Sequence, residues 1–275
     1  MKTPTITLND KTLIPQLGYG LWQVSDEETE RCSLEAILLG YRSIDCAQIY
    51  QNEAGLGRAI KACGVAREDL FITTKVWNSE HGYETTLKSF DESLKKLQLD
   101  VLDLFLIHWP APHKNSYVDT WRALIELKKQ GRVKTIGVSN FQVEHLEKII
   151  QETGVVPAIN QIELHPKFQQ KDMQAFHQQH GIQTECWSPL GQGQLLTDPT
   201  LMKIAVKHGK SIAQVIIRWH LDNGFVVIPK SVTPSRIKEN FEVMNFKLDA
   251  TDLETIAKLD DKDGRIGPNP ATATF

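Results

Sequence analysis

Short apolar runs alternate with longer amphipathic runs along almost the whole chain. The short runs are rich in Val, Ile, Leu and Phe, which is typical of strands buried on both faces. They cover residues 16–21, 43–47, 70–76, 102–108, 135–139, 159–163, 183–188 and 226–229. Runs with helical spacing follow them, over residues 27–39, 53–62, 83–97, 115–130, 142–152, 171–180, 200–208 and 235–239. Eight such units in order predict an α/β fold of the (β/α)8 or TIM barrel type.

Two elements are expected in addition to the eight units. Residues 5–8 and 11–14 flank a turn at Asn9-Asp10, which predicts an N-terminal β-hairpin that plugs the amino end of the barrel. Residues 212–221, after Ser211, predict an extra helix near the C-terminus. Gly131 and Gly154 follow helical runs, where a left-handed cap favours glycine.

The rest of the chain changes this organisation little. Residues 261–275 are rich in Gly, Pro and small side chains, which predicts an irregular tail. No linker, low-complexity tract or shift in composition divides the chain. A single domain over residues 1–275 is therefore expected.

Composition and charge exclude several classes of protein. The chain has 41% hydrophobic and 24% charged residues, which is typical of a folded globular protein and not of a disordered one. The 31 Lys and Arg residues nearly balance 34 Asp and Glu residues, so neither a nucleic acid nor an anionic membrane is an expected partner. The N-terminus has no apolar signal core, and no segment suits a membrane helix. We expect a cytoplasmic protein.

The cysteines and histidines indicate no metal site. Cys32, Cys46, Cys63 and Cys186 form no CxxC pair and match no zinc spacing, so buried, reduced thiols are expected. No HExxH motif occurs. His177 and His180 lie in a polar stretch, which favours a solvated helix face.

Polar and aromatic residues recur where the predicted strands end, which is where a parallel barrel carries its active site. These residues are Trp22, Asp45, Tyr50, Lys75, Trp77, His108, Trp109, Ser139, Asn140, Glu163, His165, Trp187, Ser188, Lys230 and Ser231. Each alone fits a structural role as a cap, a packing ring, a lysine reaching solvent or a core histidine. Their repetition favours a functional rim.

Four of these side chains could together donate a proton to a substrate: Asp45, Tyr50, Lys75 and His108. A tyrosine ordinarily titrates near about 10, and a lysine cation beside it favours the phenolate and lowers its pKa. An aspartate keeps that lysine charged, and a histidine can donate to a carbonyl oxygen. The set suits protonation of an oxygen during carbonyl reduction. Acyl transfer is disfavoured, because no GxSxG elbow occurs.

A glycine motif near the N-terminus is only a weak indication of a dinucleotide-binding fold. Residues 18–23 begin like the dinucleotide-binding GxGxxG motif, and Asp45 follows at a compatible distance. The third glycine is replaced by Gln23. This difference and the eight repeated units favour the barrel.

Several ordered segments resemble the aldo-keto reductases. Residues 40–53 resemble the signature of that family. Further matches are residues 72–77, 104–110, 136–141, 160–163, 228–233 and 236–240, so the resemblance runs from Gln16 to Leu259. Within the family, the chain is most similar to the prokaryotic 2,5-diketo-D-gluconate reductases. Trp187 supports this, since many other members have a tyrosine there.

The resemblance implies an NADPH-dependent reductase that converts an aldehyde or ketone to an alcohol, with Tyr50 as general acid. Its expected substrate is a small carbonyl, such as a sugar-derived keto acid or a methylglyoxal-like compound, and its expected state is a monomer. The implied catalytic residues are Asp45, Tyr50, Lys75 and His108. The implied cofactor-binding residues are Ser139, Asn140, Gln161, Trp187, Ser188, Pro189, Leu190, Gln192, Lys230, Ser231, Val232, Thr233, Arg236, Glu239 and Asn240. The implied substrate-binding residues are Trp22, Tyr50, Trp77, His108 and Trp109.

Two residues depart from the family pattern. Cys46 stands where Thr or Ser is commoner, and Gln48 replaces a small residue, which is expected to narrow the pocket.

Two other functions compete with that of a reductase. One alternative is a cofactor-binding regulatory or scaffold protein on the same fold, although a scaffold need not keep all four catalytic groups. The other is a hydrolase or lyase that uses Asp45 and Glu163.

Overall fold

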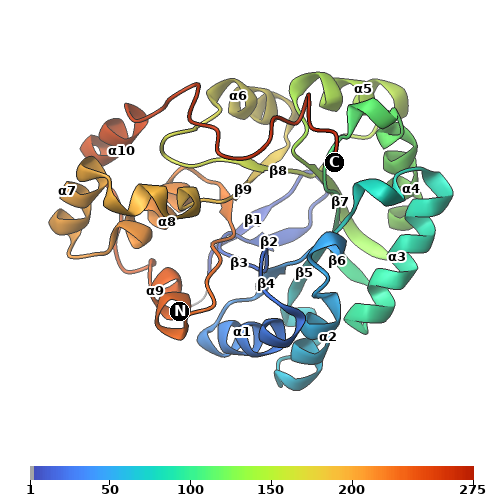
Figure 1. Ribbon diagram of the computed structural model, residues 1–275, viewed down its shortest axis with the longest axis horizontal. Helices are drawn as coiled ribbons and strands as arrows, with labels where there is room; N and C mark the ends of the chain where they lie inside the picture. The colour runs from blue at the N-terminus through green and yellow to red at the C-terminus, as the bar shows by residue number, and fades with distance from the viewer. Residues whose placement is uncertain (1–2) are drawn as a thin grey trace.

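The computed structural model describes residues 3–275, and parallel strands form a barrel at its centre (Figure 1). The strands pair in chain order: β3 (Tyr19–Gly20), β4 (Ser43–Asp45), β5 (Phe71–Val76), β6 (Leu102–Ile107), β7 (Val133–Ser139), β8 (Ile159–Glu163), β9 (Gln183–Trp187) and β10 (Val226–Val227). The two ends of this sheet also meet. The Gly18 amide donates to the Val227 carbonyl oxygen at 2.9 Å, and the Val227 amide donates to the Gln16 carbonyl oxygen at 3.0 Å. The predicted (β/α)8 barrel is confirmed.

Helices surround the strands on the outside (Figure 1). They are α1 (Asp26–Leu39), α2 (Glu53–Ala62), α3 (Tyr83–Leu97), α4 (Tyr117–Lys129), α5 (Val143–Thr153), α6 (Lys171–His180), α7 (Pro199–His208), α8 (Ile212–Asp222), α9 (Pro234–Phe241) and α10 (Ala250–Ala257). The expected extra helix is α8, and Ser211 caps it by accepting from the Gln214 amide. Gly154 ends α5 with a φ of 70°, as expected. None of the helices within residues 3–275 is both long and apolar enough to cross a membrane.

The N-terminal hairpin covers the amino end of the barrel, as expected. β1 (Thr5–Thr7) and β2 (Leu13–Pro15) pair antiparallel, and Figure 1 shows them in the middle of the ring. Leu8 and Ile14 pack with a small buried cluster that includes the first residues of β5, β8 and β10. Asn9 Nδ2 donates to the Pro157 carbonyl oxygen at 3.0 Å, just before β8. The other end of the barrel is left open.

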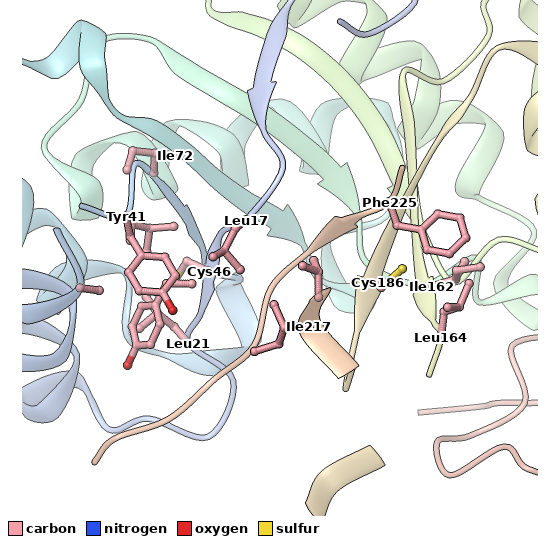
Figure 2. Close-up of a cluster of buried hydrophobic side chains, with 14 of the residues drawn as sticks. Leu17, Leu21, Tyr41, Cys46, Ile72, Ile162, Leu164, Cys186, Ile217 and Phe225 are labelled. Carbon is pink, nitrogen blue, oxygen red and sulfur yellow. The ribbon is translucent and has the colours of Figure 1, made fainter. Parts of the chain in front are cut away.

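Buried apolar side chains fill the space between the strands and the helices. Figure 2 shows part of this core, to which the sheet side contributes Leu17 and Ile72 and helix α8 contributes Ile217. Burial of one such side chain contributes roughly 1.5–3 kcal/mol, so many together hold the strand ends rigidly. All four cysteines are buried and unpaired, which confirms the expectation for them.

One prediction about local structure is wrong, and one helix was not predicted. His177 does not lie on a solvated face: it is buried, and its ring nitrogens lie 2.8 Å from Thr184 Oγ1 and 3.0 Å from Asn160 Nδ2. Its polar neighbours in sequence obscured this inward position. Helix α10 was not predicted, although Asp249 caps it and Asp252 completes a capping box. Residues 261–275 form no helix or strand, as expected.

Candidate active site

The carboxyl ends of the strands open into a cavity of about 980 Å³. Most of the residues predicted for the site line it: Trp22, Asp45, Tyr50, Trp77, His108, Trp109, Ser139, Asn140, Gln161, Trp187, Ser188, Pro189, Leu190, Gln192, Lys230, Ser231, Arg236, Glu239 and Asn240. Five of the predicted residues do not: Lys75, Val232 and Thr233, and also Glu163 and His165 of the predicted rim. A single cavity therefore brings together side chains from all parts of the barrel rim.

Lys75 lies behind the cavity wall and is fully buried in β5. Its Nζ donates to Asp45 Oδ1 at 2.5 Å and to the Cys46 carbonyl oxygen at 2.8 Å. Burial lowers the pKa of Lys75, but the charge of Asp45 raises it, and the net shift is upward. Lys75 therefore remains a cation inside the barrel, paired with a carboxylate.

Tyr50 ends a short 3-10 turn, Gln48–Tyr50, that follows β4. Its hydroxyl lies 3.5 Å from Lys75 Nζ, and that nitrogen lies 5.1 Å from the ring centroid. Burial raises the pKa of Tyr50 to about 12, although Lys75 acts to lower it. Lys75 thus acts on the pKa of Tyr50 in the expected direction, but burial outweighs the nearby charge and the net shift is upward. The phenol keeps its proton at neutral pH.

His108 follows β6, and its ring meets two aromatic rings edge-on. The ring centroids lie 5.5 Å from Tyr50 and 5.2 Å from Trp77. Burial, with the charge of Lys75, holds the pKa of His108 well below its ordinary value. The imidazole is therefore neutral and carries one N–H donor.

Aromatic rings wall the part of the cavity around Tyr50 and His108. Trp22, Trp77 and Trp109 line it as expected, and Ile49 and Phe275 join them. The Phe275 ring stacks on Trp77 with centroids 5.8 Å apart, and it meets Trp109 edge-on at 5.1 Å. Asn78 Nδ2 also donates to the Phe275 carbonyl oxygen at 2.9 Å. Nothing in the local sequence of the tail predicts this position for Phe275.

A group of polar side chains is already ordered on the opposite wall. Ser139 Oγ donates to the Gln161 carbonyl oxygen at 2.9 Å, and Asn140 Nδ2 donates to the His108 carbonyl oxygen at 3.0 Å. Trp187 Nε1 donates to Asn140 Oδ1 at 2.8 Å, which fixes the indole beside them. This wall therefore presents an aromatic face next to preorganised amide and hydroxyl groups.

The cavity continues past Trp187 toward α9. Lys230 and the exposed Arg236 line this end, and neither forms an ion pair within residues 3–275. The start of α8 contributes lining residues that were not predicted from the sequence, among them Lys210, Ser211 and Ala213. Further missed residues are Gln23, Gly193, Leu196, Met202, Ala205, Val206, Ile212, Ile228, Pro229, Gly267 and Pro268. Ser211 marked a helix start in the sequence, but nothing there showed which cavity it faced.

Gln48 does not narrow the cavity, contrary to expectation. Its Nε2 donates to Ser93 Oγ at 3.0 Å, and its Oε1 accepts from the Trp77 amide at 2.9 Å. The side chain therefore points toward α3 and supports the backbone of Trp77. Cys46 is fully buried, and its Sγ donates to Asn52 Oδ1 at 3.0 Å.

Glu163 holds the C-terminal tail and does not line the cavity. Its carboxylate accepts from the amides of Ile266 at 2.6 Å and Gly267 at 2.9 Å. His165 Nε2 lies 3.2 Å from the same carboxylate. The structure thus gives Glu163 a structural task, and it does not support the pairing with Asp45 that a hydrolase or lyase would need.

The glycines of the GxG motif belong to the barrel. Gly20 lies in β3, where an added Cβ would come within 2.9 Å of the Ile228 carbonyl oxygen. Glycine is needed there because the first and last strands approach each other closely. The motif therefore closes a barrel and does not form a phosphate-binding turn.

Comparisons with known proteins agree with this geometry. The chain is 55% identical over 273 residues to methylglyoxal reductase DkgA of Salmonella typhimurium, with 98% of each chain covered. It is 54% identical to an aldo-keto reductase of Mycolicibacterium smegmatis, with 99% of each covered. The solved structure of a Gox0644 mutant in complex with NADPH superposes with a TM-score of 0.97 at 51% identity, and all of both chains is covered. The model of the Aldo/keto reductase family matches residues 16–261. The chain belongs to the aldo/keto reductase family.

Proposed function

We propose that this protein uses NADPH to reduce a small aldehyde or ketone to an alcohol, with Tyr50 as the proton donor. The observation that carries the proposal is the Tyr50 hydroxyl at the cavity wall, 3.5 Å from Lys75 Nζ and backed by the buried Lys75–Asp45 pair. The methylglyoxal reductase name of the Salmonella relative and the NADPH in the solved complex support it. The cofactor, when bound, supplies the hydride.

The four proposed catalytic residues divide the work around the substrate oxygen. Tyr50 donates its proton as negative charge develops on that oxygen. The Lys75 cation then stabilises the phenolate that is left, and Asp45 keeps Lys75 charged and in place. His108, as a neutral donor, orients the carbonyl oxygen toward Tyr50.

The residues along the cavity fit NADPH by their chemistry. Trp187 offers a flat face for the nicotinamide ring, and Ser139, Asn140 and Gln161 offer hydrogen bonds to its carboxamide. The backbone and side chains of Ser188, Pro189, Leu190 and Gln192 would hold the pyrophosphate. The adenosine end would meet Lys230, Ser231, Val232, Thr233, Arg236, Glu239 and Asn240, of which Val232 and Thr233 lie outside the cavity lining.

Arg236 is expected to select NADPH over NADH. Its planar set of donors suits the 2′-phosphate, and the N-terminal end of α9 adds partial positive charge. A charge-assisted hydrogen bond contributes roughly 1.5–3 kcal/mol, so Arg236→Ala should weaken NADPH binding by about 10- to 100-fold. NADH binding should change little. Quenching of tryptophan fluorescence gives both dissociation constants.

Lys238→Ala is the matched control for Arg236→Ala. Lys238 lies on the same helix but pairs with Glu242 and does not line the cavity. The Lys238→Ala variant should leave the dissociation constants of both NADPH and NADH unchanged. An equal loss of NADPH and NADH binding in Arg236→Ala would show that this residue does not recognise the phosphate.

The charge of the cavity favours an uncharged substrate. The cations among the lining residues are Lys210, Lys230 and Arg236, which come from the α7–α8 and β10–α9 segments. Around Tyr50 the walls are aromatic, His108 is neutral, and Lys75 is paired with Asp45. A carboxylate on the substrate would therefore lose hydration there without gaining a partner. We propose that neutral carbonyls are preferred over keto acids.

This preference is testable with a pair of ketones that differ in charge. We expect kcat/KM with NADPH for methyl pyruvate to exceed that for pyruvate by at least about tenfold, since an unpaired charge costs more than about 1.4 kcal/mol on transfer to such walls. Rates of borohydride reduction correct for the intrinsic reactivity of the two ketones. Equal corrected values would contradict the proposed preference. No turnover of either ketone, or of methylglyoxal, would contradict the proposed function itself.

The proposed location is the cytoplasm and the proposed state is a monomer. Four buried, unpaired cysteines suit a reducing compartment. Several exposed large apolar side chains, including Leu196, Met202 and Phe275, line the cavity itself. The exposed Leu13 and Leu38 lie on separate elements, which favours a chain that acts alone.

A further inference from the structure

A second buried carboxyl group lies inside the barrel, beside the proposed catalytic centre. Glu185 stands in the middle of β9 and is 1% exposed. Its neighbour across the strand pair is Gln161 of β8. Gln161 Nε2 donates to Glu185 Oε2 at 3.0 Å and to Asp45 Oδ2 at 2.8 Å. One amide nitrogen therefore links the two carboxyl groups.

This link determines what Gln161 offers to the cavity. The side-chain amide has two N–H bonds, and the two carboxyl groups take both of them. Only its carbonyl oxygen remains, so Gln161 faces a ligand as an acceptor. Both carboxylate oxygens of Asp45 are also engaged, because Oδ2 accepts from Gln161 and Oδ1 accepts from Lys75. Four side chains thus form one hydrogen-bonded row, Lys75–Asp45–Gln161–Glu185, across four strands.

The charges around Glu185 do not balance if it ionises. Asp45 from β4 and Lys75 from β5 are the charged groups that act on it. Its other neighbours are uncharged: the Cys186 thiol on β9, Gln161 on β8, and Val226 and Val227 on β10. Because Asp45 already neutralises Lys75, a second carboxylate would leave an unpaired charge in the interior.

We propose that Glu185 is a positioning residue that keeps a neutral carboxyl group next to the Asp45–Lys75 pair and, on losing its proton to solvent at alkaline pH, weakens Tyr50 as a proton donor. Burial and the charge of Asp45 raise the pKa of Glu185 to about 8, which agrees with this geometry. The added negative charge would act on Lys75 and offset the stabilisation of the Tyr50 phenolate. The kinetic part rests on the proposed function, but the protonation state does not.

Infrared spectroscopy of the protein without cofactor tests the protonation state directly. At pH 7 the wild type should show the carbonyl stretch of a protonated carboxyl group, and Glu185→Gln should lack it. Raising the pH of the wild type through about 8 should remove the same band. A wild type that never shows the band would overturn the proposal, whether or not the variant folds.

The pH profile of kcat with NADPH tests the functional effect. In the wild type, kcat for reduction should fall as pH rises through about 8. Glu185→Gln keeps an acceptor for Gln161 but cannot ionise, so its fall should move upward by at least about one pH unit. Glu185→Leu removes the acceptor and should weaken NADPH binding, while Glu185→Gln retains it.

Asp103→Asn controls for the general loss of a buried carboxylate. Asp103 lies at the amino end of β6, where Arg67 and Lys134 contact it, away from the cavity lining. The Asp103→Asn variant should have a lower free energy of unfolding but keep the wild-type pH profile of kcat. An unchanged profile in Glu185→Gln would overturn the proposed role of Glu185. An inactive wild type would instead contradict the proposed function, and the infrared result would still decide the protonation state.

Discussion

Replacing Tyr50 by Phe is expected to lower kcat for carbonyl reduction by roughly 10²–10⁴-fold, the usual contribution of a general acid. The change removes the hydroxyl that holds the transferable proton and keeps the ring that packs at the cavity wall. NADPH binding should barely change. Steady-state oxidation of NADPH and fluorescence quenching measure the two quantities separately.

Tyr83→Phe provides the matched control for this change. Tyr83 is exposed at the start of α3 and does not line the cavity. Loss of its hydroxyl should leave both kcat and NADPH binding at their wild-type values. Near-normal turnover by Tyr50→Phe would show that another group delivers the proton.

Replacing Lys75 by Met is expected to abolish most activity and to destabilise the protein. The change keeps most of the side-chain stem but leaves Asp45 buried without its cation. Breaking a buried pair in this way costs about 3–5 kcal/mol of the free energy of unfolding. Thermal denaturation and kcat follow the two effects.

A double variant separates the catalytic loss from the structural one. Asp45→Asn combined with Lys75→Met removes both charges, so it should recover part of the lost stability. Its activity should stay as low as that of Lys75→Met alone, because no cation remains to stabilise the phenolate. A Lys75→Met enzyme that behaves like the wild type would contradict the proposed role.

The sequence predicts the barrel well because its strands are buried on both faces. Such strands appear as short apolar runs, and the predicted bounds of β8, α2, α3 and α6 agree with the structure. Strand β10 is shorter than predicted, since only Val226–Val227 has ladder pairing before the chain reaches Pro229. Helix α10 escaped prediction because no strand precedes it and the eight units were already complete.

From residue types alone, the candidate site was predictable only where strand ends determine it, and the family resemblance added the residues farther along the cavity. The lining by Asp45, Tyr50 and His108 follows from their places after apolar strands. Phe275 could not be assigned in the same way, because its contacts with Trp77 and Trp109 join segments far apart in sequence. Glu185 lies within a strand and not after one, so the strand ends did not point to it. The direction of the Tyr50 pKa shift also depends on burial, which the pairing of residue types does not show.

Transfer of deuterium from the cofactor to the product tests whether this protein reduces a carbonyl with the hydride of NADPH. The wild type is given methylglyoxal and NADPH labelled with deuterium at the transferable position of the nicotinamide, and the product is examined by mass spectrometry. The proposed function predicts an alcohol that carries the deuterium on its carbinol carbon, formed in equal amount to the NADPH consumed. An unlabelled product, or loss of methylglyoxal without consumption of NADPH, would contradict it.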